Sequence, residues 1–370
     1  MENGTLCLRF LPTTTIISLF DKMQNFKKHL EAFGLNPEDC VVAPFGLGHI
    51  NKTFKVTASY SQHFVLQQIN TAVFKNPNLI LENWLKARQH LSHFAPSYRF
   101  LEYKALLNGK WLFEDSDGTI WRMLNFVDQS ITKETVENVA QARLTAKAFA
   151  RFSTLLQGAD VQSFNVILPR FHDLSFRQQQ FDQALGSASA ERLLQANETI
   201  LQLNANRWLT TYFEKISPVL PIRIVHMDAK ISNVLFNNTL DDVSCIIDLD
   251  TMMPGTILSD VGDMIRSMVC EAAEDENDLS KIQVRTDILQ AIIESYSAEI
   301  ADIQAVEKEN LAFGGIMLVY MQALRFVTDF LENDHYYSIK YPSHNLVRGI
   351  NQCNLLQKLL QEPVMAGYHL

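Results

Sequence analysis

The chain has 370 residues, which at roughly 150 residues per domain allows two or three domains. Its composition, with 47% hydrophobic and 20% charged residues, is that of a folded globular protein and excludes a disordered one. The formal charge of -9 would repel a phosphate backbone or an anionic membrane surface, so we expect no nucleic-acid partner and no membrane partner.

Residues 1–24 are interpreted as an N-terminal extension. Residues 6–20 are fairly apolar, but Arg9 and Pro12 interrupt them and no basic residues precede them, as they would in a secretory signal. The segment is also shorter than the roughly 20 apolar residues of a membrane span. We expect no later stretch to reach that length.

Residues 25–127 are expected to form a small antiparallel β lobe with one inserted helix. A short helix at residues 26–33 ends at Gly34, and the inserted helix begins at Pro77, where apolar residues recur with the helical period. Short β-branched or aromatic runs separated by turn residues predict five or six strands. The expected strands are residues 41–45, 53–58, 64–69, 98–105, 111–114 and 120–127.

Residues 128–370 are expected to form a larger, mainly helical lobe. A long amphipathic helix at residues 136–155 opens this lobe, and helices resume from residue 284. The acidic run at residues 271–278 is interpreted as a solvated loop. The clear β signals are short apolar runs at residues 222–225, 234–236 and 244–247. The whole pattern predicts a two-lobed α+β fold.

The five cysteines are scattered, odd in number and without CxxC spacing. This distribution argues against a disulfide framework and against a thiolate zinc site. We therefore expect reduced thiols and a cytoplasmic protein, while the sequence leaves the oligomeric state open.

The strongest chemical signal is an HxDxxxxN pattern, followed by an apolar strand that leads into two aspartates. Residues 225–236 read VHMDAKISNVLF, and residues 245–251 read CIIDLDT. Asp228 and Asn233 lie on a loop that enters a hairpin, and Asp248 leaves the partner strand, so the three side chains can converge. A carboxylate that orients an attacking hydroxyl, with an amide oxygen and a second carboxylate that hold Mg²⁺, suits phosphoryl transfer.

Residues around this pattern are interpreted as support. His226 is expected to fix the loop through a backbone hydrogen bond, and Asp263 and Arg266 are expected to cap the following helix and to brace the loop. Lys230 either contacts the transferring phosphate or lies on the loop surface.

A second signal is the turn between the first two strands of the small lobe, where residues 45–56 read FGLGHINKTFKV. Its glycines would let backbone amides approach phosphate oxygens closely. Alone, such a turn is usually a plain β-turn. Ahead of the aspartate motifs, and in a β-rich lobe, it indicates a two-lobed kinase.

These motifs resemble the aminoglycoside phosphotransferase and choline kinase superfamily, the small-molecule branch of the protein-kinase-like folds. Within it, the chain looks most like the N-acetylhexosamine 1-kinases. That resemblance spans about residues 40 to 350, in stretches that read GHINKT, FVLQQIN, HMDAKISN, IDLDTMMPG, RFVTDF, YY and YPSHNL.

The resemblance implies an ATP- and Mg²⁺-dependent kinase that phosphorylates the anomeric hydroxyl of an N-acetylhexosamine, with ATP between the lobes. It implies Asp228 as the catalytic base and Asn233 and Asp248 as the magnesium ligands. The implied nucleotide contacts are Gly46, Gly48, His49, Asn51, Gln67, Leu124 and Phe126. The implied sugar contacts are His49, Asp228, Arg325 and Tyr336, with Asp329 as a further candidate.

The third strand departs from the wider superfamily, which has a lysine there to meet the α and β phosphates. This strand offers Gln67 and Gln68 instead. Glu82, on the inserted helix, is a candidate hydrogen-bond acceptor for Gln67.

Three alternatives stay open at this point. The first is the same fold acting on another small alcohol of the choline, homoserine or aminoglycoside type. The second is a metallohydrolase, whose ligands would be His226, Asp228, Asp248 and Asp250. The third is a catalytically silent nucleotide-binding scaffold, which the missing lysine suggests and the intact aspartate motifs oppose.

Overall fold

The computed structural model describes residues 26–46, 50–59 and 62–368. The predicted N-terminal extension, Gly48 and His49 lie outside the described residues. Within them the cysteines carry free thiols, as predicted; these are Cys40, Cys245, Cys270 and Cys353.

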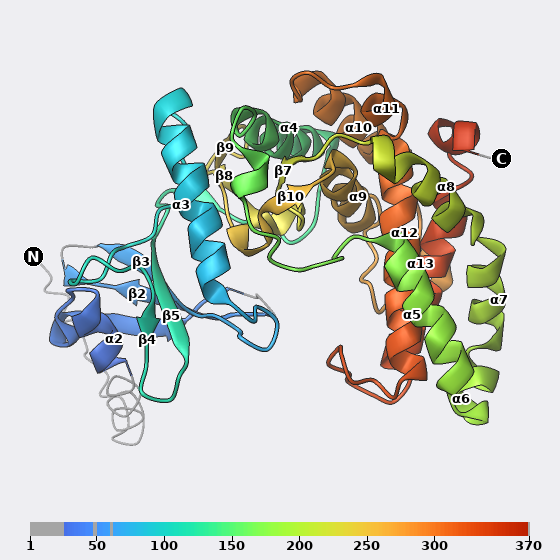
Figure 1. Ribbon diagram of the computed structural model, residues 1–370, viewed down its shortest axis with the longest axis horizontal. Helices are drawn as coiled ribbons and strands as arrows, with labels where there is room; N and C mark the ends of the chain where they lie inside the picture. Colours follow the sequence, from blue (N-terminus) through green and yellow to red (C-terminus); the bar gives the residue numbers. More distant parts are fainter. Residues whose placement is uncertain (1–25, 47–49, 60–61, 369–370) are drawn as a thin grey trace, which may run out of the picture. The chain divides into compact units, whose positions relative to one another are not determined.

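The chain divides into two compact units (Figure 1). The first comprises Met1–Pro77 and Leu101–Asp128, and the second comprises Asn78–Phe100 and Gln129–Leu370. Helix α3 (Pro77–Phe94) therefore groups with the second unit. Its Asn83 shows why, because the side-chain amide donates to the carbonyl oxygens of Asn165 and Met252, each at 2.9 Å.

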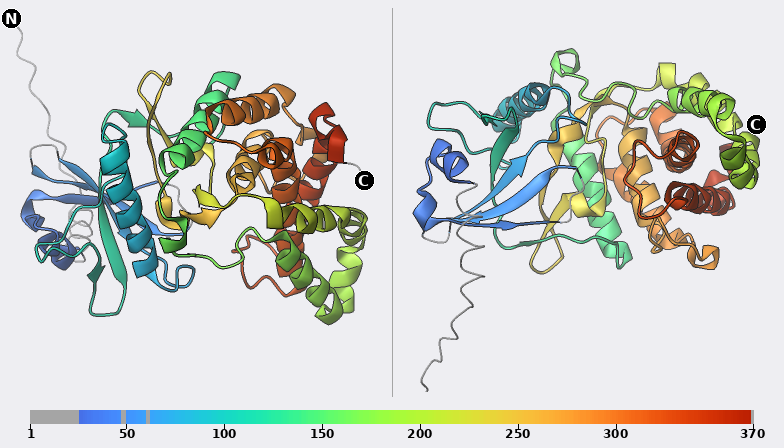
Figure 2. Two further views of the ribbon diagram at one scale, coloured as in Figure 1. Left: turned by 45° about the horizontal axis from the view of Figure 1, so that its top comes forward. Right: turned by 90° about the horizontal axis from the view of Figure 1, so that it is seen from below.

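The first unit is built on a five-stranded antiparallel sheet with the strand order β1-β2-β3-β5-β4. The first three strands follow one another as the predicted meander. Helix α2 (Lys27–Ala32) lies against this sheet (Figures 1 and 2). The strands are β1 (Val41–Pro44), β2 (Lys52–Thr57), β3 (His63–Gln68), β4 (Phe113–Glu114) and β5 (Ile120–Asn125).

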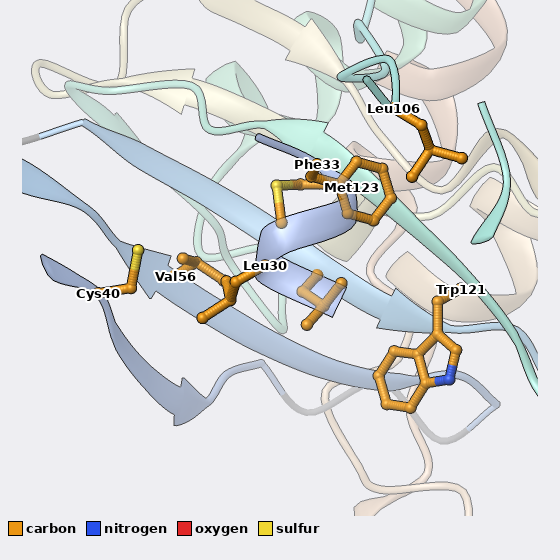
Figure 3. Close-up of a cluster of buried hydrophobic side chains, with 8 residues drawn as sticks. Leu30, Phe33, Cys40, Val56, Leu106, Trp121 and Met123 are labelled. Carbon is orange, nitrogen blue, oxygen red and sulfur yellow. The ribbon is translucent and has the colours of Figure 1, made fainter. Parts of the chain in front are cut away.

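One face of this sheet packs on helix α2 and forms the core of the unit (Figure 3). Val56, Leu66 and Met123 lie on this face, because side chains alternate along each strand and the register keeps partners on the same side. Leu30 and Phe33 from the α2 region complete the cluster. Each fully buried side chain of this kind stabilises the fold by roughly 1.5–3 kcal/mol.

The strand predicted at residues 98–105 is wrong. In this segment Tyr103 pairs with the sheet through a single bridge to Leu124. Phe100 belongs to the second unit, where it stacks on Trp84. The segment therefore passes from one unit to the other, and it cannot follow one sheet edge over its length.

The second unit contains two small β elements, which the sequence predicted in part. β7, β8 and β9 match the predicted runs, whereas β6 and β10 were missed because they are so short. β10 also contains Pro254, which has no N–H to donate to a ladder. β6 (Ser130–Ile131), β8 (Val234–Asn237) and β9 (Val243–Ile246) form one sheet, and β7 (Arg223–Val225) pairs with β10 (Met253–Gly255).

Helices make up most of the second unit. Helix α4 (Val139–Leu155) is the predicted long helix, and the side chain of Asn138 caps its first turn by accepting from the N–H of Gln141. Helix α9 (Ile257–Met268) follows β10. The other helices are α5 (Leu174–Ser187), α6 (Ala190–Gln195), α7 (Asn197–Ala205), α8 (Trp208–Ile216), α10 (Thr286–Glu299), α11 (Ala305–Glu309), α12 (Leu311–Leu331) and α13 (His344–Leu359).

Helix α12 corrects the expectation that no stretch reaches membrane length. It has 21 residues and is apolar enough to span a membrane by length and composition. However, 89% of its apolar window is buried inside the protein. It packs against helices α9, α13 and α5 (Figures 1 and 2), as a core helix does.

Helices α9 and α12 approach each other closely through glycine. A Cβ on Gly314 of α12 would lie only 2.7 Å from the carbonyl oxygen of Leu258 on α9. Gly262 of α9 faces the carbonyl oxygen of Gly314 just as closely. Backbone contact of this kind fixes the position of α9, which carries several residues of the site described next.

Candidate active site

The loop between β7 and β8 is anchored by a buried carboxylate from helix α9. Asp260 accepts the backbone N–H groups of His226 at 3.1 Å and Met227 at 2.8 Å. Burial raises the pKa of Asp260 to about 7, against the effect of these two hydrogen bonds. Met227 has a φ of 66°, a left-handed conformation that costs free energy in a residue other than glycine. The anchor thus holds a strained turn immediately before Asp228.

His226 has the structural role that the sequence predicted. Its ring is fully buried, Nε2 lies 2.9 Å from the carbonyl oxygen of Ile247, and Nδ1 accepts the N–H of Asp228 at 3.3 Å. Burial lowers the pKa of His226, so the ring is neutral and its proton sits on Nε2, facing the carbonyl. Because both ring nitrogens are engaged, His226 does not serve as the ligand that the metallohydrolase alternative requires.

Asp228 is held at one carboxylate oxygen. Asn233 donates its side-chain amide to Oδ2 of Asp228 at 2.9 Å, and Nζ of Lys230 lies 3.0 Å from the same atom. Burial opposes the charge on Asp228, but Lys230, His226 and the hydrogen bonds outweigh it and lower the pKa of the carboxyl. Lys230 is thus paired with Asp228 instead of lying loose on the loop surface.

Asn233 and Asp248 are the predicted metal ligands, and their chemistry fits Mg²⁺. An ionised Asp228 only accepts hydrogen bonds, so the amide nitrogen of Asn233 faces it and Oδ1 is turned away. Asp248 follows β9 with a φ of 60°, and the preceding Ile247 donates its N–H to the carbonyl oxygen of Asn233 at 3.0 Å. An amide oxygen and a carboxylate are oxygen ligands of the type that Mg²⁺ prefers.

No metal site built only from histidine, cysteine, aspartate and glutamate side chains is found in the described part of the chain. Its residues contain no group of three or more histidine, cysteine, aspartate or glutamate side chains arranged to hold a metal ion.

Helix α9 adds a partly buried ion pair between Asp263 and Arg266. Both residues lie inside the helix, so the predicted capping role is wrong, and the predicted bracing of the loop stays a prediction. The Arg266 guanidinium lies 3.3 Å from Asp263 and 3.2 Å from Glu274. Burial raises the pKa of Asp263 to about 6, although Arg266 opposes this shift. Asp263 also interacts electrostatically with Asp228 and Lys230, so it belongs to the same charged cluster.

The acidic run at residues 271–278 is a loop with no buried residue, as expected, but several of its carboxylates form ion pairs. Besides Glu274, Asp275 is engaged, with Nζ of Lys340 at 2.7 Å and Nε2 of the buried His344 at 3.1 Å from its Oδ2. Hydrogen bonds from Lys340 and His344 lower the pKa of Asp275 to about 2. The acidic run therefore ties helix α9 to the segment between α12 and α13.

Arg325 and Tyr336, the predicted sugar contacts, lie together. Nη2 of Arg325 is 3.5 Å from the Tyr336 hydroxyl, and its guanidinium is 5.6 Å from that ring. Arg325 also donates to Oε1 of Gln322 at 3.1 Å. Tyr336 is 67% exposed, so the pair is accessible to a ligand.

Asp329 does not fit its predicted role as a sugar contact. Its carboxylate is only 4% exposed and accepts the backbone N–H groups of Tyr336 at 2.7 Å and Tyr337 at 2.9 Å. The side-chain amide of Asn345 donates to it as well, at 2.9 Å. Asp329 is therefore the anchor that positions Tyr336.

The sequence did not reveal His172 and Arg177, which the structure brings to Arg325 and Asp228. Burial lowers the pKa of His172 to about 3, with further contributions from Arg325 and Arg266, so its ring is neutral. Its ring stacks on Phe171, whose carbonyl oxygen accepts from Arg177 at 3.2 Å. The negative charge of Asp228 tends to raise the pKa of His172, so these two side chains interact electrostatically. A lone histidine in a loop offers no periodicity or motif by which the sequence could single it out.

In the first unit, the described nucleotide-contact candidates lie at strand ends. Gly46 follows β1 with a φ of +77°, a conformation that favours glycine. Oδ1 of Asn51 accepts the N–H of Asn70 at 3.0 Å, which joins the start of β2 to the end of β3. Leu124 lies near the end of β5, and Phe126 follows it and donates its N–H to the carbonyl oxygen of His63.

Gln67 has partners other than the one predicted for it. Its Oε1 accepts from Nε of Arg122 at 2.9 Å, and its Nε2 donates to the hydroxyl of Thr53 at 3.1 Å. Glu82 accepts from the side-chain amide of Asn165 at 2.8 Å. Gln67 and Glu82 thus each form hydrogen bonds within their own unit.

Known structures share this fold at low sequence identity. An amicoumacin kinase in complex with AMP-PNP, Ca²⁺ and Ami is 12% identical with a TM-score of 0.60, over 92% of this chain and 96% of that one. A spectinomycin phosphotransferase in complex with ADP and spectinomycin is 12% identical with a TM-score of 0.58, over 92% and 98%. A Plasmodium vivax ethanolamine kinase is 14% identical with a TM-score of 0.54, over 94% and 91%.

These likenesses confirm the predicted α+β kinase-like fold. The model of the phosphotransferase enzyme family matches residues 41–313, which is more than half of the chain. This range includes the loop of Asp228 and Asn233, the Asp248 turn and helix α9. The chain therefore belongs to the phosphotransferase enzyme family.

Proposed function

We propose that this phosphotransferase is an ATP-dependent kinase that phosphorylates the anomeric hydroxyl of an N-acetylhexosamine and produces the sugar 1-phosphate. The observation that carries the proposal is the geometry of Asp228. Asn233 and Lys230 both engage Oδ2 of this carboxylate, and no residue in the described ranges bonds Oδ1, which can therefore accept from an incoming hydroxyl. The choice of acceptor rests on the sequence resemblance and on the charges near Asp228.

In the proposed reaction Asp228 orients the acceptor hydroxyl and accepts its proton. The hydroxyl oxygen forms a bond to the γ-phosphorus of ATP, the bond from that phosphorus to the β-phosphate oxygen breaks, and ADP leaves. The lowered pKa of Asp228 supports this role, because the carboxylate is ionised near neutral pH. The left-handed Met227 and the Asp260 anchor hold the base in place before substrate arrives.

ATP and Mg²⁺ are the proposed cofactors. Asn233 and Asp248 would hold Mg²⁺, which neutralises phosphate charge when it is bound. The structures with AMP-PNP and with ADP support the assignment of a nucleotide. In the first unit, Gly46 and Gln67 are the described candidates for the phosphates.

The charges near Asp228 favour a neutral acceptor over a cationic one. His172 is neutral, and Arg325, Arg266 and Arg177 all act on it electrostatically. Arg266 is already paired with Asp263 and Glu274, but Arg325, beside the exposed Tyr336, would repel an ammonium substrate. The Arg325 guanidinium would donate hydrogen bonds to sugar hydroxyls and to an acetamido carbonyl oxygen. This argues for an N-acetylhexosamine and against an acceptor of the ethanolamine or choline type.

The direct test is an acceptor panel. The purified protein is incubated with ATP, Mg²⁺ and one of several N-acetylhexosamines, their non-acetylated sugars, choline, ethanolamine or homoserine. ADP release identifies the acceptor, and phosphorus–proton coupling in the product NMR spectrum identifies the phosphorylated position. We expect phosphate on the anomeric oxygen of an N-acetylhexosamine. Turnover with an amino alcohol alone, or phosphate on another hydroxyl, would contradict the proposed acceptor.

A further inference from the structure

A row of hydrogen-bonded side chains crosses the sheet of the first unit. Thr53 is the register partner of Gln67, and Gln67 is the partner of Arg122, so the three side chains share one face. The neighbouring positions Leu66 and Met123 point to the opposite face, into the cluster under helix α2. The polar row is therefore separate from the core that holds the unit together.

The hydrogen bonds fix which way the Gln67 amide points. A guanidinium has donors only, so Oε1 of Gln67 faces Nε of Arg122, at 2.9 Å. The amide nitrogen is consequently turned toward Thr53, whose hydroxyl accepts one of its two hydrogens at 3.1 Å. Among the residues that the structure describes, none accepts the second N–H of Gln67, which is therefore an oriented donor.

Arg122 brings a positive charge to β5, the strand next to the one where the lysine is missing. Its side chain is only 3% exposed, and its Nη1 donates to the Tyr103 hydroxyl at 2.8 Å. The planar guanidinium is held at two of its nitrogens, by Gln67 and by Tyr103, so its position relative to Gln67 is fixed. The positive charge therefore lies on β5, one strand away from the lysine position on β3. The hydrogen bond between Arg122 and Gln67 links the charge to that position.

Beside the polar row, the same face of the sheet carries two apolar side chains. Val65 and Leu124 are register partners two residues along from Gln67 and Arg122, which places them on the same side of the sheet. Two residues of strand span roughly 7 Å. An apolar patch beside an oriented donor and a cation offers complementary surfaces to the base and the phosphates of a nucleotide.

We propose that Arg122 is a positioning residue for the nucleotide phosphates, acting through Gln67 in place of the strand lysine of other kinases. Arg122 orients and polarises the Gln67 amide, whose second N–H binds a phosphate oxygen, and it adds the positive charge that Gln67 lacks. This inference rests on the proposed function, because it takes Gln67 as a nucleotide contact.

The test compares variants by steady-state kinetics and by direct binding of AMP-PNP. Arg122→Gln removes the charge, and we expect the KM for ATP to rise about tenfold or more while the KM for the acceptor changes less than twofold. Gln67→Met keeps Arg122 and removes the oriented donor, so it should raise the KM for ATP similarly. Gln67→Lys combined with Arg122→Gln returns a cation to β3, and we expect it to recover most of the loss of Arg122→Gln.

A matched control separates this effect from simple destabilisation. Arg223, on β7, is a largely buried arginine, 11% exposed, and pairs with Glu307 at 2.7 Å. We expect Arg223→Gln to lower the melting temperature without a selective change in the KM for ATP. If Arg122→Gln folds too poorly for kinetics, Gln67→Met and the double variant give the same comparison.

The outcomes distinguish this inference from the proposed function. If the unaltered protein binds AMP-PNP, and Arg122→Gln or Gln67→Met leaves the KM for ATP unchanged, the inference is wrong and the kinase assignment stands. An equal rise in both KM values, or no recovery in the double variant, would also overturn it. If the unaltered protein neither binds AMP-PNP nor consumes ATP, the proposed function itself fails.

Discussion

Asn233 and Asp228 are joined twice, because one side-chain amide of Asn233 donates to the carbonyl oxygen of Asp228 at 2.8 Å and to its carboxylate at 2.9 Å. The short helical turn Ile231–Asn233 folds the chain back so that this five-residue spacing closes. The same amide that orients the proposed base also turns its own oxygen toward the proposed metal position. The orientation of the proposed base and the proposed binding of Mg²⁺ thus both depend on the side chain of Asn233.

The Asn233→Ala substitution should have a larger effect on turnover than on the stability of the fold. It removes the donor that holds Oδ2 of Asp228 and one proposed Mg²⁺ ligand, so we expect kcat to fall by about 10²-fold or more. Asn237→Ala, at the other end of β8, should leave kcat near that of the unaltered protein. Titration of Mg²⁺ at saturating ATP gives a second measurement, and an unchanged Mg²⁺ requirement in Asn233→Ala would remove Asn233 from the proposed ligands.

Lys230→Met should shift the pH dependence of kcat/KM. Burial tends to raise the pKa of Asp228, and Lys230 is the first of the groups that lower it below its ordinary value of 3.8. Without this cation the pKa of the base rises, so activity should be lost at a higher pH as the solution is acidified. A pH–rate profile measures the position of this acidic limb, with Lys133→Met as a control on a surface pair. A limb that stays in place in Lys230→Met would show that the ion pair does not set the pKa.

Gly314→Ala should destabilise the second unit. The added Cβ would meet the carbonyl oxygen of Leu258 at 2.7 Å, and that backbone atom cannot move without displacing helix α9. We expect the free energy of unfolding to fall by about 1–3 kcal/mol, as measured by chemical denaturation. Gly186→Ala in helix α5 is the matched control, since its Cβ would meet nothing within 4 Å. Equal stability of the two variants would contradict the close helix contact.

Asp275→Asn should lower the melting temperature in a pH-dependent way. The pKa of Asp275 is depressed to about 2 by hydrogen bonds from Lys340 and His344, against 3.8 for the unperturbed carboxyl. A depressed carboxyl stabilises the folded state above its unfolded pKa, and this contribution is lost as the pH falls through the folded value. The difference between the two proteins should therefore be constant above about pH 4 and should shrink toward pH 2. A difference that grows on acidification would contradict the assigned ion pair.

Much of the fold was predictable because local patterns agreed with the final packing. The alternation of apolar residues in β2 and β3 corresponds to a face that is buried in the structure. The helical period of the apolar residues in α4 does so as well. The segment around Phe100 and Tyr103 was mispredicted as a strand because its apolar residues serve two units. The local sequence does not show that Phe100 packs in one unit while Tyr103 pairs in the other.

The candidate site was predictable where its residues are close in sequence. Asp228 and Asn233 lie five residues apart, and their contact follows from the loop that joins them. Arg122 and His172 were missed because their importance comes from burial and from partners distant in sequence. Asp329 was misjudged for a related reason, since its neighbours in the chain do not reveal that three donors surround it.

The most direct test of the account is turnover of Asp228→Asn at saturating ATP and acceptor, with AMP-PNP affinity measured on the same preparation. The account predicts that turnover falls by roughly 10²- to 10⁴-fold, because the base is lost, while nucleotide affinity changes only a few-fold. Near-normal turnover in Asp228→Asn would contradict the central claim that this carboxylate activates the acceptor hydroxyl.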